Sequence, residues 1–202
     1  MSVETRCIYL VGPSSTGKTT LCRALAAKLK LDKASVISEV AREVLKSHNF
    51  TRDHVNLLRM QEAILEAHLK RESEVLGRTS APLLLCDRSA IDPVAYAILG
   101  AKNDNDAEER KKILITSAAF QEALNRYRKS LFILFKPVEG WLVDDGVRSL
   151  DNKIGCAEVF ETVLEEFDIK FLKMGPDMTD LSERVQFAVD AIQESFGIIL
   201  EE

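Results

Sequence analysis

The stretch Cys7-Ile8-Tyr9-Leu10-Val11-Gly12-Pro13-Ser14-Ser15-Thr16-Gly17-Lys18-Thr19-Thr20 joins an apolar run, a loop bounded by two glycines and the start of a helical pattern. Gly12 and Gly17 bracket four residues and are followed by lysine and threonine, which matches G-x-x-x-x-G-K-[ST] at every fixed position. After the motif, leucines recur at helical spacing, at Leu21, Leu25 and Leu29. The stretch therefore predicts a phosphate-binding loop between a buried strand and a helix.

The loop residues have distinct expected roles toward a nucleoside triphosphate. Backbone N–H groups of the loop and of the helix N-terminus surround the phosphates, and the helix dipole favours their negative charge. We expect Lys18 to reach the β- and γ-phosphates and the hydroxyl of Thr19 to bind Mg²⁺. The nucleotide-binding residues expected on this basis are Gly12, Ser14, Ser15, Thr16, Gly17, Lys18, Thr19 and Thr20. The alternative is a glycine-rich turn that binds nothing.

Length and composition indicate an ordinary globular protein. The 202 residues fit a single domain over 1–202, since we find no internal repeat, low-complexity tract or linker. Hydrophobic residues make up 46 % of the chain and charged residues 29 %, which excludes disordered and fibrous classes. The net charge of −5 argues against a generally basic surface and so against nucleic acid as a partner. The oligomeric state does not follow from the sequence.

Compartment and redox state follow from what the sequence lacks. The first expected strand begins near Arg6, which leaves no room for a secretory signal, and no apolar run is long enough to span a bilayer. We therefore expect a cytoplasmic protein without a membrane span. The four cysteines lie in apolar patterns without metal-ligand spacing, so we expect reduced core thiols at Cys7, Cys22, Cys86 and Cys156. The three histidines lie in polar contexts, so we expect solvated side chains at His48, His54 and His68.

A second strand, expected over residues 35–38, ends at Glu39. In open α/β sheets ligands collect outside the carboxyl ends of the strands, so Glu39 and Arg42 are candidates for binding a phosphoryl acceptor. Glu39 could act as general base for an acceptor hydroxyl or hold that hydroxyl by a hydrogen bond. The alternative is a carboxylate that favours a helix start, with Arg42 solvated one turn further on.

The run Pro82-Leu83-Leu84-Leu85-Cys86-Asp87 predicts a third strand, buried on both faces and closed by a carboxylate. This pattern is typical of a Walker B strand, in which Asp87 lies near Mg²⁺ or its water ligands. We expect Arg88 to neutralise charge on a transferring phosphoryl group and Ser89 to cap the next helix. An apolar strand followed by aspartate is also common as plain helix capping.

The remaining pattern alternates helices and strands. We expect a long helix capped by Thr51 and ending near Leu76, and a further helix over about residues 107–127. Buried strands are expected over 131–135 and 169–172, and a closing helix over about 180–196. The mixed segment over about residues 138–150 suits a lid that brings Arg148 to the γ-phosphoryl group and Trp141 to the acceptor. The alternative is a surface loop with Trp141 in the core.

This order of elements predicts an α/β fold with three layers, in which helices cover both faces of a parallel sheet of about five strands. Three further segments accompany the glycine-rich loop in the same order along the chain: Ile37-Ser38-Glu39-Val40-Ala41-Arg42-Glu43, Asp87-Arg88-Ser89-Ala90-Ile91-Asp92-Pro93 and Trp141-Leu142-Val143-Asp144-Asp145-Gly146-Val147-Arg148. Together they resemble the AAA-type P-loop family that includes the nicotinamide riboside kinase domain of the bacterial NAD-biosynthesis regulator and an animal GTP-binding trafficking protein. The resemblance covers nearly the whole chain and is especially close to stand-alone fungal members.

The resemblance implies a sheet of the nucleoside and nucleotide kinase kind, with strand order 2-3-1-4-5. The Asp-Arg-Ser run at Asp87 is also similar to the Glu-Arg-Ser run of deoxyribonucleoside kinases, in which the acid serves the metal and the arginine serves the phosphates. This similarity implies the same two roles for Asp87 and Arg88, with a shorter reach to Mg²⁺ because aspartate replaces glutamate.

The leading functional hypothesis is a kinase that uses Mg²⁺ and ATP, or GTP, to phosphorylate a hydroxyl of a small acceptor, for instance a nucleoside such as nicotinamide riboside. The residues expected to carry catalysis are Lys18, Glu39, Asp87, Arg88 and Arg148. Glu39, Arg42 and Trp141 are expected to bind the acceptor, and Thr19 and Asp87 the metal. Two alternatives remain open at this point: a GTP- or ATP-binding regulatory module with slow hydrolysis, and a polynucleotide 5′-hydroxyl kinase.

Overall fold

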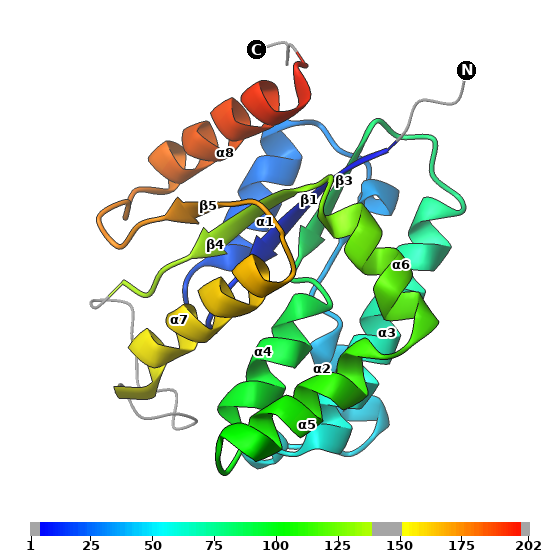
Figure 1. The fold of residues 1–202 in the computed structure, drawn as a ribbon. Helices are drawn as coiled ribbons and strands as arrows, with labels where there is room; N and C mark the ends of the chain where they lie inside the picture. The colour runs from blue at the N-terminus through cyan, green and yellow to red at the C-terminus, as the bar shows by residue number, and fades with distance from the viewer. Residues whose placement is uncertain (1–4, 139–150, 199–202) are drawn as a thin grey trace.

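The computed structural model describes residues 5–138 and 151–198 of the chain. At its centre, five parallel strands form a sheet in the order β2-β3-β1-β4-β5 (Figure 1). The strands are β1 (Arg6–Val11), β2 (Val36–Ile37), β3 (Leu83–Asp87), β4 (Leu131–Phe135) and β5 (Phe171–Met174). Strands β3 and β4 are buried along their whole length, which explains why they appear in the sequence as continuous apolar runs. The α/β class and the strand order implied by the family resemblance are both confirmed.

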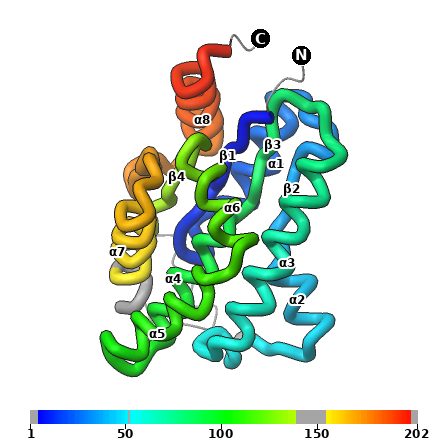
Figure 2. Tube along the Cα trace, turned by 45° about the vertical axis from the view of Figure 1, so that its right-hand side comes forward, coloured from blue at the N-terminus to red at the C-terminus, as the bar shows by residue number. Residues whose placement is uncertain are grey.

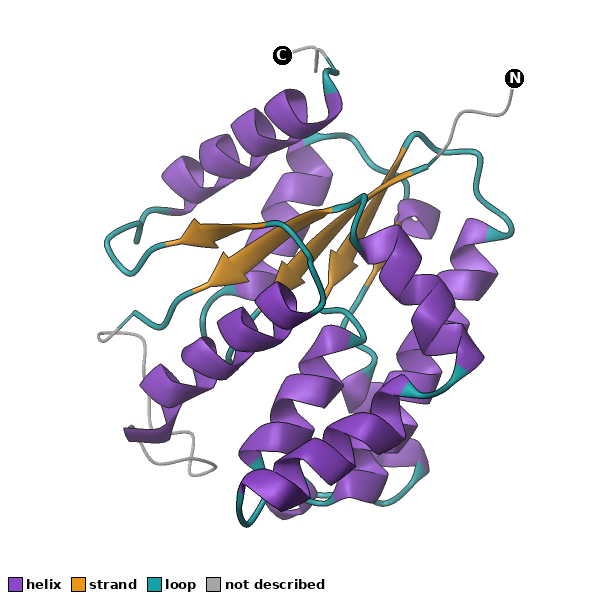
Figure 3. Cartoon of the chain, in the orientation of Figure 1, coloured by secondary structure: helices purple, strands orange, loops and turns teal. Residues whose placement is uncertain are grey.

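Helices cover both faces of the sheet and make the fold three-layered (Figure 3). The helices are α1 (Lys18–Lys28), α2 (Ala41–Ser47), α3 (Leu58–Leu76), α4 (Ile91–Leu99), α5 (Asp104–Ile115), α6 (Ala118–Tyr127), α7 (Asp151–Glu166) and α8 (Leu181–Phe196). Alternate residues of β1 point into two separate cores. Ile8 and Leu10 pack with α1 and α8, whereas Cys7, Tyr9 and Val11 pack with the helices of the opposite layer, chiefly α3, α4, α6 and α7. Figure 2 shows α8 and α7 on opposite sides of the strands.

Parallel pairing brings the predicted functional segments to one edge of the sheet. Leu10 lies opposite Asp87 in the β1–β3 pairing, and Ile37 lies opposite Cys86 in the β2–β3 pairing. The glycine-rich loop after β1, Glu39 after β2 and the Asp87-Arg88 pair after β3 therefore follow neighbouring strand ends. This edge holds the candidate site.

The chain between residues 33 and 58 is less regular than the sequence predicts. Residues Lys33–Ser35 form a 3₁₀ turn, η1, which shortens β2 to two residues. The predicted cap of the long helix at Thr51 is wrong, because a second 3₁₀ turn, η2 (Arg52–His54), follows Thr51 and α3 begins only at Leu58. The short helix α2 follows β2, and a helix start here was the alternative interpretation of Glu39.

The single helix expected over residues 107–127 is two helices. Helix α5 begins earlier, at Asp104, where the side chain of Asn103 accepts the N–H of Asp106 at 3.0 Å. It ends at Ile115, and the hydroxyl of Ser117 accepts the N–H of Phe120 at 3.2 Å to start α6. An N-cap with this local hydrogen bond allows the chain to turn within two residues.

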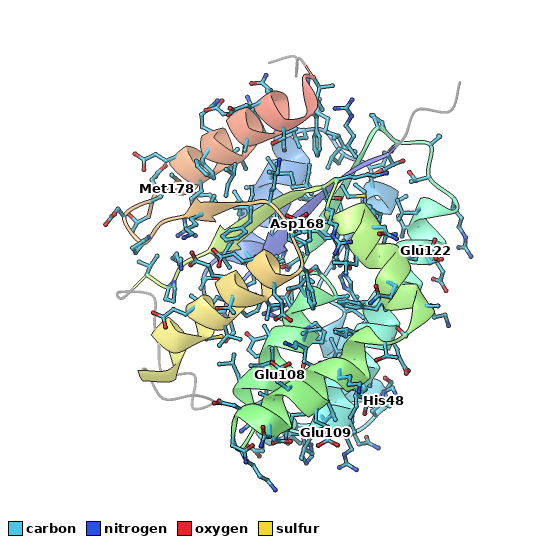
Figure 4. The ribbon with its side chains drawn as sticks, viewed as in Figure 1. His48, Glu108, Glu109, Glu122, Asp168 and Met178 are labelled. Carbon is cyan, nitrogen blue, oxygen red and sulfur yellow. The ribbon has the colours of Figure 1, made fainter. Side chains whose placement is uncertain are left out.

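The last strand lies two residues later than expected. Asp168, labelled in Figure 4, has a left-handed φ of 55° and ends the turn after α7. The N–H of Ile169 then donates to the carbonyl oxygen of Leu164 at 2.9 Å, so Ile169 completes the end of the helix instead of starting the strand. Strand β5 consequently starts at Phe171, which pairs with Phe132.

The expected state of the cysteines is confirmed, whereas one histidine differs from its prediction. All four cysteines are buried thiols. His48 is exposed, but His68 is only 2 % exposed and lies against buried Glu72, which contacts Tyr127 of α6. In the part of the chain that the structure describes, no helix is both long enough and apolar enough to cross a bilayer.

Candidate active site

The glycine-rich loop depends on backbone conformations that favour glycine. Gly12 has a φ of 127°, and a Cβ at this position would lie only 2.7 Å from the carbonyl oxygen of Phe135 in β4. Gly17 has a φ of 87° and directly precedes α1. Ser15, between them, is also left-handed, with a φ of 62°. These positive φ values let the loop turn sharply between β1 and α1, as the motif predicts.

Lys18, the first residue of α1, is buried beneath this loop. Its Nζ donates to Thr16 Oγ1 at 3.1 Å and also contacts the carbonyl oxygen of Pro13. Burial lowers the pKa of Lys18 to about 7; repulsion from Arg88 acts in the same direction, and nearby carboxylates act against both. A neighbouring anion would favour the charged ammonium, so this position suits an amine that binds phosphate.

Thr19 and Asp87 come from different elements and meet directly. Thr19 Oγ1 donates to Asp87 Oδ2 at 2.6 Å. Asp87 closes β3 and is 2 % exposed, and its Oδ1 has no hydrogen-bond partner among the described residues. A buried carboxylate oxygen without a partner is costly, because desolvation is then uncompensated.

These two residues fit a magnesium ion. Mg²⁺ prefers oxygen ligands and is commonly held by one or two protein groups together with phosphates and water. The hydroxyl of Thr19 and the free oxygen of Asp87 supply such a pair. Within the described ranges no cluster of three or more histidine, cysteine or acidic side chains forms a self-sufficient metal site. The pair is thus suited to a metal that arrives with a nucleotide.

Arg88 links the ends of β2 and β3. Its Nε donates to Glu39 Oε1 at 2.8 Å, and its Nη1 donates to Asp92 Oδ1 at 2.8 Å. Arg42 donates from Nε to the other oxygen of Glu39 at 2.9 Å. Arg88 has a φ of 88°, which is strained for a residue with a side chain. Glu39, Arg42 and Arg88, all selected from the sequence, are therefore one connected cluster.

The charges in this cluster influence one another. Burial by itself raises the pKa of Glu39, but Arg88 and Arg42 outweigh burial and hold that pKa below its ordinary value. Glu39 is therefore an ionised carboxylate that orients two guanidinium groups. Burial raises the pKa of Asp92, although Arg88 and Lys18 oppose the change. The cluster leaves Arg88 positively charged beside the glycine-rich loop, where its Nη1 also lies 3.4 Å from the carbonyl oxygen of Gly12.

Two side chains that the sequence analysis missed brace the loop from opposite layers. The hydroxyl of Tyr96, on α4, accepts the N–H of Ser14 at 3.1 Å. Arg184, on α8, is 1 % exposed and donates from Nη1 to the carbonyl oxygen of Thr16 at 2.9 Å. Arg184 also donates from Nε to the carbonyl of Met178, which lies at the turn before α8 (Figure 4). No local signal marks either residue, because the contact that each makes with the loop spans more than eighty residues of chain.

A buried polar network supports the turn after Asp87. The hydroxyl of Tyr127 donates to Glu72 Oε1 at 2.8 Å and accepts the N–H of Ala90 at 3.1 Å. Glu72 is fully buried, and it also pairs with Arg126 and with His68, whose Nε2 lies 2.8 Å away. The spacing of His68 and Glu72 on one helical face was the only sequence signal for this network. The network binds the backbone N–H of Ala90, and Asp92 accepts the N–H of the neighbouring Ser89, so both support the turn after Arg88.

The other predicted site residues fall into two groups. Ser14, Ser15, Thr16, Gly17 and Thr20 lie on the loop and the first turn of α1, and of these only Thr16 is buried. Trp141 and Arg148, with nearly all of the predicted lid, lie outside the described residues.

Comparison with protein families gives a match to an AAA domain over residues 7–184, which is most of the chain. The chain belongs to this AAA domain family. The match begins in β1 and ends at Arg184. It therefore contains the glycine-rich loop, Glu39 after β2, Asp87 at the end of β3, and Arg184 itself. A sequence comparison with curated proteins gives no significant match.

Two of the solved structures that are similar to this chain are structures of NadR. One, NadR in complex with NR, has a TM-score of 0.72 and 23 % identity, and it covers 98 % of this chain and 53 % of NadR. The other, NadR with NAD and AMP-PNP, has a TM-score of 0.74 and 22 % identity, with 98 % and 52 % covered. This chain therefore spans about half the length of NadR.

A third similar structure is shikimate kinase from Acinetobacter baumannii in complex with shikimate. Its TM-score is 0.53 at 17 % identity, and 96 % of each chain is covered. At these identities the three structures establish a shared P-loop kinase fold.

Proposed function

We propose that this protein is a kinase that transfers the γ-phosphoryl group of ATP to a hydroxyl of a small acceptor in the presence of Mg²⁺. The observation that carries the proposal is the convergence of three groups at adjacent strand ends: buried Lys18, the Thr19–Asp87 pair and the Arg88–Glu39 pair. These are the parts that phosphoryl transfer requires, since it depends mainly on positioning and on neutralising charge.

Each residue of the candidate active site has a role in the proposed transfer step. The acceptor oxygen bonds to the γ-phosphorus while the bond from that phosphorus to the β–γ bridging oxygen breaks, and ADP leaves. Lys18 and the loop N–H groups hold the phosphates, and Arg88 neutralises the transferred group. Thr19 and Asp87 would hold the magnesium ion, which when bound neutralises charge on the phosphates. Glu39 orients the acceptor hydroxyl, whose proton passes to Glu39 or to water.

Two features of the similar structures guide the choice of substrates. NadR has been captured with NR and with AMP-PNP, an ATP analogue, so nicotinamide riboside and ATP are the first acceptor and donor to test. Trp141 and Arg148 remain proposals for the acceptor site and for charge neutralisation. A regulatory module that binds GTP or ATP and a polynucleotide kinase are distinct outcomes of the same experiment.

The test is transfer of label from γ-labelled ATP or GTP to a panel of nucleosides, including nicotinamide riboside, and short RNAs. We expect label on a small acceptor, and we expect the Lys18→Ala variant to lose turnover by roughly a thousandfold or more, since electrostatic groups of this kind contribute several kcal/mol. Lys129→Ala, which removes an exposed lysine far from the loop, is the matched control. Release of free phosphate alone would favour the regulatory module, and label on RNA would favour the polynucleotide kinase.

A further inference from the structure

A groove of about 470 Å³ starts at the candidate active site and runs along the outside of α1. Thr19, Cys22, Arg23 and Ala26 line one wall, and their spacing places them on a single face of the helix. The groove is therefore about 10 Å long on this side, given a rise of 1.5 Å per residue. Its volume is within the range usual for small-molecule sites.

The groove differs in character from end to end. Its inner end holds Thr19, Asp87 and Glu39, the oxygen-bearing residues of the candidate active site. Away from these residues the lining is apolar, formed by Ala26 on α1 together with Leu31 and Val36. Small side chains at positions 22 and 26 leave width there for a flat ring.

Two cations line the groove from different elements, Arg23 on α1 and Lys33 in η1, and they are not neutralised. Arg23 and Lys33 both line the groove, both are exposed, and neither forms an ion pair with any described residue. The third cation of the lining, Arg42, is already paired with Glu39, which also holds Arg88. In a protein with a net charge of −5, two unpaired cations beside an apolar slot form a local site for negative charge.

We propose that this groove binds a small molecule with a flat apolar body and a phosphate or carboxylate group, of the size of a nucleoside monophosphate. The body lies against Ala26, Leu31 and Val36, and the anionic group lies between Arg23 and Lys33. Such a ligand is either the phosphoryl acceptor itself or an effector bound next to the reacting groups. In both cases it has a flat apolar body and an anionic group.

The binding experiment does not depend on turnover. The probe is uridine 5′-monophosphate, titrated by calorimetry into the full chain in the presence of saturating Mg·AMP-PNP, which competes for the glycine-rich loop. We expect the double variant Arg23→Glu/Lys33→Glu to weaken binding by roughly tenfold or more, because two attractions become repulsions. The affinity for the unmodified protein is also expected to fall as salt is raised, since both cations are exposed.

Three controls make the result specific. Uridine, which lacks the charge, should bind the unmodified protein roughly tenfold more weakly than its monophosphate. Ala26→Phe fills the apolar part of the groove without changing charge and should also abolish binding. The charge-matched double variant Lys102→Glu/Lys129→Glu, at exposed positions outside the groove, should bind as the unmodified protein does. Equal melting temperatures verify that all variants fold.

The outcomes separate this proposal from the proposed kinase function. The proposal that the groove binds this ligand would be overturned by either of two results. One is equal affinity of the unmodified protein and Arg23→Glu/Lys33→Glu, and the other is equal affinity for uridine and its monophosphate. Binding that is lost in Lys18→Ala but kept in the groove variants would assign the probe to the glycine-rich loop and also overturn it. If the groove binds the probe, transfer of label to it identifies an acceptor, whereas a changed rate with another acceptor identifies an effector.

Discussion

Asp87 is a side chain that lowers the stability of the fold and at the same time suits the binding of a ligand. One of its oxygens is satisfied by Thr19, and the other is buried without a partner among the described residues. An uncompensated buried carboxylate oxygen lowers stability, and such groups concentrate where a ligand later supplies the missing interaction. The sequence located this aspartate, because an apolar strand ending in an acid is a local pattern. It could not show that one oxygen is free.

We predict that Asp87→Asn selectively weakens the binding of Mg²⁺. Asparagine can still accept from Thr19, but its amide is a poor metal ligand in place of a carboxylate. The Mg²⁺ concentration that gives half-maximal nucleotide binding should rise by roughly ten- to a hundredfold. Magnesium titrations at fixed nucleotide measure this, with the exposed Asp177→Asn as control. An unchanged Mg²⁺ dependence would remove Asp87 from the metal site.

Gly12 is the second residue at which a local pattern has a clear steric meaning. We predict that Gly12→Ala lowers the free energy of unfolding by about 1–3 kcal/mol, because its φ of 127° is strained for alanine and the new Cβ would meet the carbonyl of Phe135 at 2.7 Å. Gly175→Ala is the matched control, since a Cβ there meets nothing within 4 Å. Urea unfolding compares the two, and equal losses of stability would contradict the steric argument.

At the scale of elements, the sequence predicted what local patterns encode. The buried strands β3 and β4 begin and end close to the expected residues, because continuous apolar runs bounded by polar residues are unambiguous. The break between α5 and α6 was missed because residues on both sides of it favour helix. His68 was assigned to solvent because a helical pattern does not reveal that this side chain lies against buried Glu72.

The network under the Arg88 turn is an element-scale feature, since it joins α3, α6 and the start of α4. We predict that Tyr127→Phe lowers the free energy of unfolding by about 1–3 kcal/mol, because it removes the partner of the buried Ala90 N–H and a donor to buried Glu72. Thr162→Ala, which removes an exposed hydroxyl bonded within its own helix, should change stability by less than about 0.5 kcal/mol. Chemical denaturation measures both. Similar effects of the two changes would show that the Ala90 contact is not important.

For the whole molecule, contacts between distant parts of the chain decide what the sequence could not reveal. Arg184 reaches Thr16 from 168 positions away, and Arg126 reaches Glu72 from 54 positions away. Neither pairing leaves a periodic signal, so no local pattern selects these residues. The candidate site was largely predictable because its residues follow strand ends, whereas the supports behind it depend on packing between layers.

The pH dependence of global stability reports on one of these supports. Burial alone would raise the pKa of Glu72, but His68, Arg126 and Tyr127 outweigh it and hold that pKa below the ordinary value of 4.5. The ionised form therefore stabilises the fold above about pH 4.5, and this contribution is lost as the pH falls through the lower folded-state pKa.

We predict that Glu72→Gln is less stable than the unmodified protein at pH 7 and that the difference narrows below about pH 4.5. The loss at neutral pH is expected to be about 3–5 kcal/mol, as for breaking a buried ion pair. Urea unfolding between pH 3 and pH 7 measures both effects. A constant difference across this range would contradict the assignment of a lowered pKa to Glu72.

The burial of every cysteine makes the native protein convenient for site-specific attachment of reporters. Burial raises the pKa of Cys22 to about 12, so little thiolate is available for alkylation while the chain is folded. A single thiol placed at an exposed position such as Glu122, on α6 in Figure 4, can therefore carry a fluorophore or spin label without first removing the natural cysteines. Conversely, the rate at which maleimide consumes the natural thiols records how often the layers of this fold come apart.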